Sequence, residues 1–200
     1  MRIVELIIDE KDETSGIDAV SVVESPAIES DFIALKKHEI ELKEVDAEKR
    51  ILMGAALIPN KQIYRKNEKN EEYYIYFSEE TVRKASELFF MNSNQNNATL
   101  EHKQKLEGMS VVESWITEGK NDKSMNYGFN FPKGTWVISM KVNNDEIWNK
   151  VKLGEVKGFS IEGYFADKSM PLSKVETDDE KLAKVIDILT EFQKSNKVNN

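Results

Sequence analysis

A series of short apolar segments, separated by polar and turn-forming stretches, most constrains what this chain can fold into. Segments of this length and composition are typical of β-strands rather than of helices. Few of them alternate with helical patterns, as the strands of a parallel sheet would. We therefore expect strands over residues 2–8, 19–23, 51–58, 62–65, 72–77, 109–117 and 135–142, and a further strand around Ser160.

Helical patterns interrupt the strands at three places. Ser78 is followed by two glutamates and by apolar residues at helical spacing, which predicts an N-cap and a helix. Asn143 and Glu146 have the spacing of a capping box, and Gly154 fits the end of that helix. Residues 178–193 predict a last amphipathic helix. Together these elements indicate an α+β fold built on a mainly antiparallel β-sheet or barrel with a few flanking helices.

The length of the chain suits one domain followed by an extension. We expect the domain to span residues 1–168, with the charge-dense stretch 37–50 as an edge strand or a surface linker. Residues 169–177 contain proline and serine and are interpreted as a linker to the helix at 178–193. Residues 194–200 are polar and are expected to be a mobile tail.

The composition excludes several classes of function. A net charge of −8 argues against non-specific binding to nucleic acid, which needs a positive surface. No apolar run is long enough to span a membrane, and acidic residues interrupt the N-terminal segment where a signal peptide would be apolar. The chain has no cysteine, no phosphate-binding glycine loop and no zinc motif. We therefore expect an intracellular protein that needs no metal or cofactor.

Ser160 is the first candidate for a catalytic residue. It lies between glycines in Lys157-Gly-Phe-Ser-Ile-Glu-Gly163, at the beginning of an expected strand. A serine hydroxyl becomes a good nucleophile only when a neighbouring base takes its proton. The chain has two histidines: His38 lies in a charge run typical of a solvated face, and His102 follows a polar loop. His102 is therefore the expected partner of Ser160.

The order of these motifs along residues 98–166 resembles that of a known family. It runs from His102 through Gly108-Met-Ser-Val-Val-Glu-Ser-Trp-Ile116 and Gly134-Thr-Trp-Val137, then a short helix that ends at Gly154, then Gly158-Phe-Ser-Ile-Glu-Gly163. This set is similar to the serine proteases of tailed phages, which belong with the prohead maturation proteases. Those proteases resemble the herpesvirus assemblin fold, and the resemblance therefore implies an assemblin-like fold for this chain.

The resemblance also implies an activity. Ser160 would attack a peptide carbonyl, and His102 would accept its proton and pass it to the leaving amine. The protein would be an endopeptidase that cuts scaffold and major capsid proteins, and itself, during head maturation. It would work in the host cytoplasm within the assembling procapsid, and resemblance to assemblins makes a homodimer worth testing. The alternative is a structural or scaffold-associated head protein with the same fold and no catalysis.

The third catalytic residue stays open between three acids. Glu162 shares a strand face with Ser160, and two strand steps span about 6.6 Å, which one imidazole could bridge. Asp18 lies in Ile17-Asp-Ala-Val-Ser-Val-Val-Glu-Ser-Pro-Ala27, which resembles a segment that prohead proteases carry after the serine. Its position at the start of this chain suggests a circular permutation, but the motif places its acid at Ala19, one residue away. Asp18 could therefore serve only if a bulge redirected it. Glu113, on the strand after His102, is the third option.

Overall fold

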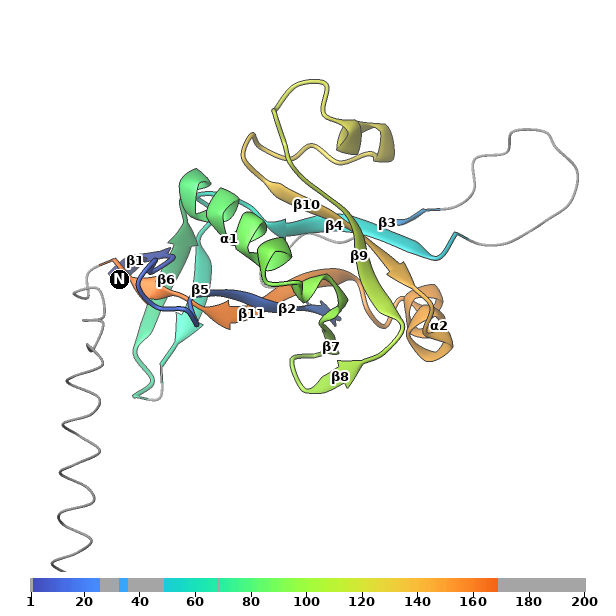
Figure 1. Ribbon diagram of the computed structural model, residues 1–200, viewed down its shortest axis with the longest axis horizontal. Coiled ribbons are helices and arrows are strands. Elements are labelled where there is room, and N and C mark those ends of the chain that lie inside the picture. Colours follow the sequence, from blue (N-terminus) through green and yellow to red (C-terminus); the bar gives the residue numbers. More distant parts are fainter. Residues whose placement is uncertain (1, 26–32, 36–48, 68, 169–200) are drawn as a thin grey trace, which may run out of the picture.

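The computed structural model describes residues 2–25, 33–35, 49–67 and 69–168. Within these residues the strands form three four-stranded sheets (Figure 1). The first sheet has the order β12 (Ala166–Asp167), β1 (Arg2–Ile7), β6 (Glu72–Phe77) and β5 (Ile63–Lys66). The second has the order β3 (Ile33–Leu35), β4 (Ile51–Leu57), β10 (Trp136–Val142) and β9 (Met109–Ile116). The third has the order β11 (Gly158–Tyr164), β2 (Gly16–Val23), β7 (Ala98–Leu100) and β8 (Gln104–Leu106).

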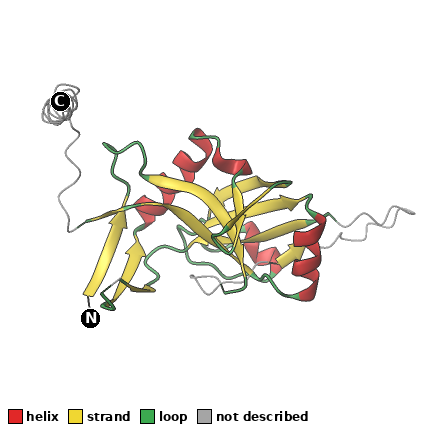
Figure 2. Cartoon of the chain, turned by 90° about the horizontal axis from the view of Figure 1, so that it is seen from below, coloured by secondary structure: helices red, strands yellow, loops and turns green. Residues whose placement is uncertain are grey.

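The described part of the chain contains many more strands than helices (Figure 2), so the expectation of an α+β fold is confirmed. The pairs β1–β6 and β2–β7 are parallel, and the other pairs are antiparallel. None of the three sheets closes into a barrel within the described residues. The two helices of this part of the chain are too short or too polar to cross a lipid bilayer.

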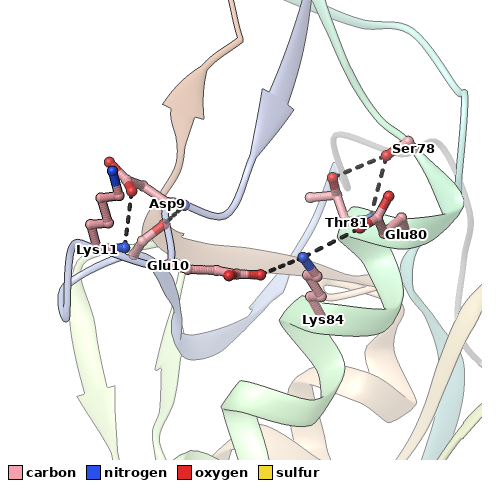
Figure 3. A network of polar contacts seen from close by, with 8 residues as sticks. Asp9, Glu10, Lys11, Ser78, Glu80, Thr81 and Lys84 are labelled. Atoms are coloured by element: carbon pink, nitrogen blue, oxygen red, sulfur yellow. Dashed lines mark hydrogen bonds and ion pairs between the residues drawn. The ribbon is translucent and has the colours of Figure 1, made fainter. Parts of the chain in front are cut away.

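Helix α1 (Glu79–Met91) begins where the sequence predicts, because the side chain of Ser78 accepts a hydrogen bond from the Thr81 backbone N–H. Lys84 then holds the helix to the turn after β1 through an ion pair of 2.5 Å with Glu10, and also contacts Glu80 (Figure 3). The buried face of α1 packs on β2. The helix therefore supports β2 from the apolar side of the third sheet.

Helix α2 (Asp145–Leu153) begins one residue later than its capping-box spacing suggests. Asn144, not Asn143, is the N-cap, and its side chain accepts from the Ile147 backbone N–H. The N–H of Asn143 instead donates to the carbonyl of Gly108, in the turn between β8 and β9. Gly154 ends the helix with a φ of 71°, as expected. The helix expected at 178–193, with the linker before it and the tail after it, lies outside the described residues.

The hairpin of β7 and β8 is absent from the sequence-based expectations. Each of its strands has only three residues, which is too short for an alternating pattern to emerge. Its parallel pairing with β2 ends at Leu100 opposite Val22, which places the turn after β7 beside the end of β2. His102 lies in that turn, so the missed hairpin is what brings His102 to the sheet.

The two faces of the third sheet differ in character. Val20, Val22, Ala98 and Phe159 are buried on one face and belong to the main hydrophobic core. Side chains on neighbouring positions of a strand point to opposite faces, so the alternate residues of β2, β7 and β11 share the other face. That second face carries the polar side chains considered next.

Candidate active site

Ser160 and Glu162 lie on the polar face of β11. Ser160 is directly opposite Ser21 of β2, and Glu162 is opposite Ala19. Ser160 is partly exposed, and its hydroxyl forms no hydrogen bond with the described residues. In the described part of the chain β11 is the edge strand of its sheet.

His102 lies in a strained turn between β7 and β8. The Lys103 N–H donates to the Leu100 carbonyl, and both central residues, Glu101 and His102, have positive φ angles of 52° and 58°. Two positive φ angles define a type I′ turn, in which asparagine and glycine are the favoured residues. A non-glycine residue in this region costs about 1–3 kcal/mol, and such residues cluster at functional sites. The other histidine, His38, lies outside the described residues.

Ser21 fixes the backbone of His102 in this turn. Ser21 is fully buried; its Oγ accepts the His102 backbone N–H at 3.0 Å and donates to the Thr99 carbonyl at 3.3 Å. One hydroxyl thereby joins β2, the end of β7 and the turn. The carboxylate of Glu101 adds a second connection, to the residue that follows β2, because it accepts the Glu24 backbone N–H at 2.6 Å.

Glu162 holds the imidazole of His102. Nδ1 of His102 is 3.2 Å from Oε1 of Glu162, and the hydroxyl of Thr99 donates to the same oxygen. A carboxylate only accepts hydrogen bonds, so this contact places the proton of a neutral imidazole on Nδ1. Nε2 is then the nitrogen with a free lone pair, as a general base requires. The Glu162 side chain is 29% exposed and that of His102 43%, so the imidazole is accessible while its acid partner is partly shielded.

The other two acids lie elsewhere. Asp18 occupies a β-bulge, because β11 pairs with Ala19 and Ile17 and leaves Asp18 unpaired. The bulge that this candidate required is therefore present, but the Asp18 side chain is exposed and makes no contact with His102. Glu113 lies in the second sheet, where it accepts from Ser139 at 2.7 Å and pairs with Lys123 at 3.3 Å. The Ser139 hydrogen bond is the main cause that lowers the pKa of Glu113, with Lys123 adding to it against the effect of burial.

Gly163 makes the bulge possible. A Cβ at this position would lie 1.9 Å from the carbonyl oxygen of Gly16 and 2.8 Å from Cα of Ile17. Both of these are backbone atoms that cannot move aside as a flexible side chain could. Only glycine therefore allows β11 and β2 to approach closely here, one residue beyond Glu162.

The structure brings Ser160, His102 and Glu162 to one polar face, but leaves one expected contact unmade. The Ser160 hydroxyl and the His102 imidazole, both described, are not hydrogen-bonded to each other. Hydrogen bonds of a catalytic centre are often long before substrate binds. The arrangement offers a serine hydroxyl and, on the same face, a histidine held by an acid, which are the side chains that nucleophilic catalysis by serine uses.

Sequence reasoning missed the contributions of Ser21 and Thr99. Ser21 has one visible signal, which is its place as a polar residue between valines in a buried strand. Thr99 carries no such signal, because threonine is common on strands. Among the described residues, no group of three or more histidine, aspartate or glutamate side chains is arranged to hold a metal ion.

Comparison with known proteins places this chain in a family. Residues 39–169, more than half of the chain, match the family described as "Putative phage serine protease XkdF". The chain is also 35% identical over 75 residues to the "Uncharacterized protein YqbD" of Bacillus subtilis (strain 168). This match covers 36% of the chain and 22% of the relative's length. No solved structure is significantly similar to the fold.

Proposed function

This chain belongs to the phage serine protease family that residues 39–169 match, and from that membership we propose that it is a serine endopeptidase. Ser160 is its nucleophile, His102 its general base and Glu162 the acid that orients His102. The observation that carries the proposal is the 3.2 Å contact between His102 Nδ1 and Glu162, on the strand face that also bears Ser160.

The pairing of β11 with β2 supports Glu162 as the acid. The segment at 17–27 resembles the one in which prohead proteases carry their acid, at the position of Ala19 here. Ala19 is the cross-strand partner of Glu162, and directly opposite residues have Cβ atoms about 4.5–5.5 Å apart. A carboxylate moved from position 19 to position 162 would therefore occupy nearly the same place beside the histidine. We infer that this chain carries the acid on the nucleophile's own strand.

The geometry suggests the following order of events. Binding of a peptide turns the His102 side chain so that Nε2 meets the Ser160 hydroxyl, while Nδ1–H keeps its bond to Glu162. His102 takes the serine proton as Ser160 attacks the carbonyl carbon, and Glu162 stabilises the imidazolium that forms. The proton passes to the leaving amine, and water then hydrolyses the acyl-enzyme with His102 again as base. Only the imidazole must move, and its 43% exposure leaves room for that.

The biological setting follows from the family rather than from the site. We propose that the substrates are the scaffold and major capsid proteins of a phage head, and this chain itself. Cleavage would take place in the host cytoplasm, inside the assembling procapsid, where a homodimer is the expected form. An assemblin-like fold and a circularly permuted β2 segment are part of the same proposal, and the direct pairing of β2 with β11 supports the latter.

Co-expression with the head proteins of its phage tests this function. The wild-type protein should shorten scaffold or capsid protein, as measured by intact-protein mass spectrometry, and the Ser160→Ala variant should not. Ser110→Ala is the matched control, because it also removes one serine hydroxyl from a partly exposed strand position. Equal processing by wild type and Ser160→Ala would contradict the mechanism. Absence of processing in all samples, together with incorporation of the protein into heads, would favour the non-catalytic structural alternative.

A further inference from the structure

The first sheet has one face on which apolar side chains are exposed. We propose that this face binds the C-terminal extension of the same chain, residues 178–193, as an amphipathic helix. The docking is independent of the proposed peptidase activity. It gives the extension a defined place on the domain that carries the candidate active site.

The two faces of the first sheet, whose strands β1, β6 and β5 lie at the left of Figure 1, differ in burial. The inner face contributes four buried side chains to the main hydrophobic core: Val4, Ile63, Ile75 and Phe77. Because side chains alternate along a strand, the residues between these positions point to the opposite, outer face. Side chains on the outer face do not belong to the core that the inner face completes.

Three apolar or aromatic side chains form a row across the outer face. Ile3 of β1 is directly opposite Tyr74 of β6, and Tyr74 is directly opposite Tyr64 of β5. The rings of Tyr64 and Tyr74 meet edge to face, with 6.0 Å between their centroids. Ile3 is 53% exposed and Tyr64 is 47% exposed, and a hollow of about 350 Å³, lined in part by Ile3 and Tyr76, adjoins the row. Adjacent exposed side chains of this kind, unlike scattered ones, indicate an interaction surface.

The chain leaves the described structure at this same face. Lys168 is the last described residue; its backbone N–H donates to the Glu5 carbonyl, and its side chain pairs with the Glu5 carboxylate at 2.6 Å. Glu5 lies two positions after Ile3 on β1, so both side chains point to the outer face. Residues 169–177 can span at most about 30 Å, and a four-stranded sheet is about 14 Å across. The extension can therefore reach any part of the outer face.

The sequence of the extension suits an apolar surface. In a helix over residues 178–193, five apolar residues recur at intervals of three or four and form one stripe: Leu182, Val185, Ile186, Leu189 and Phe192. Isolated helices of roughly 15 residues are marginal in water, so such a helix needs a surface that covers its stripe. Attachment through a short linker gives the outer face an effective concentration in the millimolar range, which favours it over a separate partner.

Hydrogen exchange of the full-length protein, followed by mass spectrometry, tests the docking. Peptides from residues 182–192 should exchange at least about tenfold more slowly in wild type than in Ile3→Asp. Val112→Asp is the matched control, because Val112 is 51% exposed on β9 of the second sheet and should leave that exchange unchanged. Leu189→Asp should remove the protection as Ile3→Asp does, whereas Lys184→Ala, on the polar side of the expected helix, should not. Intact mass confirms before each measurement that the extension is present.

Cross-linking identifies which chain occupies the face. The protein has no cysteine, so Tyr64→Cys and Val185→Cys together introduce its only two thiols, which a short bismaleimide should join within one molecule. A product with the mass of one chain, formed equally at low and high protein concentration, supports docking within the chain. Cross-links between two chains would assign the face to a second copy and overturn the proposal. Equal exchange in wild type, Ile3→Asp and Val112→Asp, or protection only after a phage head protein is added, would also overturn it.

Discussion

Replacing Ser21 with alanine should slow peptide hydrolysis, although the Ser21 side chain would not contact the substrate. Ser21 Oγ is the acceptor for the His102 backbone N–H at 3.0 Å and donates to the Thr99 carbonyl at 3.3 Å, inside a fully buried position. Loss of a hydroxyl that leaves a polar partner unsatisfied costs about 1–3 kcal/mol. We expect a value of about 1–2 kcal/mol, because the turn that contains His102 lies at the surface and water can reach part of it.

The effect on catalysis follows from the strain in the same turn. His102 has a φ of 58°, which is unfavourable for a residue with a side chain, and the bond to Ser21 helps to hold it there. Without that bond the imidazole should lose its fixed position beside Glu162. A displacement of about 1 Å can cost on the order of a hundredfold in rate, so kcat should fall about 10- to 100-fold with little change in KM.

Ser139→Ala is a matched control for this experiment. Ser139 is also a fully buried serine with a hydrogen bond to a side chain, but it lies in the second sheet and contacts Glu113. Urea unfolding should show a loss of stability of about 1–2 kcal/mol for both variants. Peptide hydrolysis should be slowed in Ser21→Ala alone. Equal rates for Ser21→Ala and wild type, or equal slowing by both variants, would refute the view that Ser21 positions His102.

Three further substitutions test the site and the strand that carries it. Glu162→Gln should lower kcat by about 10²- to 10⁴-fold, because the imidazole loses the partner that selects its tautomer. Asp18→Asn is the control and should leave kcat near that of wild type. Similar kcat values for the two variants would contradict a catalytic role for Glu162. His102→Asn should abolish peptide hydrolysis. It should keep the free energy of unfolding within about 1 kcal/mol of wild type, because asparagine tolerates a positive φ. A large loss of stability in urea would indicate that the role of His102 is structural. Gly163→Ala should destabilise the fold by more than about 3 kcal/mol, since its Cβ would collide with the backbone of Gly16, and an unchanged melting temperature would show that the two strands are further apart.

The elements that sequence patterns predict well are those with a local cause. Ser78 caps α1 and Gly154 ends α2, because each effect depends on the residue's own hydrogen bonds or backbone freedom. The β5–β6 hairpin and the strand of Ser160 also appear where expected, since their residues alternate clearly. The cap at Asn144 differed by one residue from the expected one. The backbone N–H of Asn143 is bound to the carbonyl of Gly108, in the turn between β8 and β9, and local spacing does not reveal that contact.

The site could be predicted only in part, because its geometry depends on pairing between distant strands. Glu162 was a candidate through its two-residue spacing from Ser160, which is a local property of a strand. The turn that presents His102 could not be predicted, since Glu101 and His102 occupy positions where asparagine and glycine are usual. The contribution of Ser21 depends on a contact with a residue 81 positions away, and a single sequence gives no sign of that contact.

Covalent labelling of the nucleophile tests the central claim most directly. The folded protein is incubated with a fluorophosphonate, which reacts with activated serine hydroxyls, and the modified residue is located by peptide mass spectrometry. We predict a single adduct on Ser160, which disappears in Ser160→Ala and forms much more slowly in His102→Asn. The absence of an adduct, an adduct on another serine, or equal labelling when His102 is replaced would contradict a Ser160–His102–Glu162 catalytic centre.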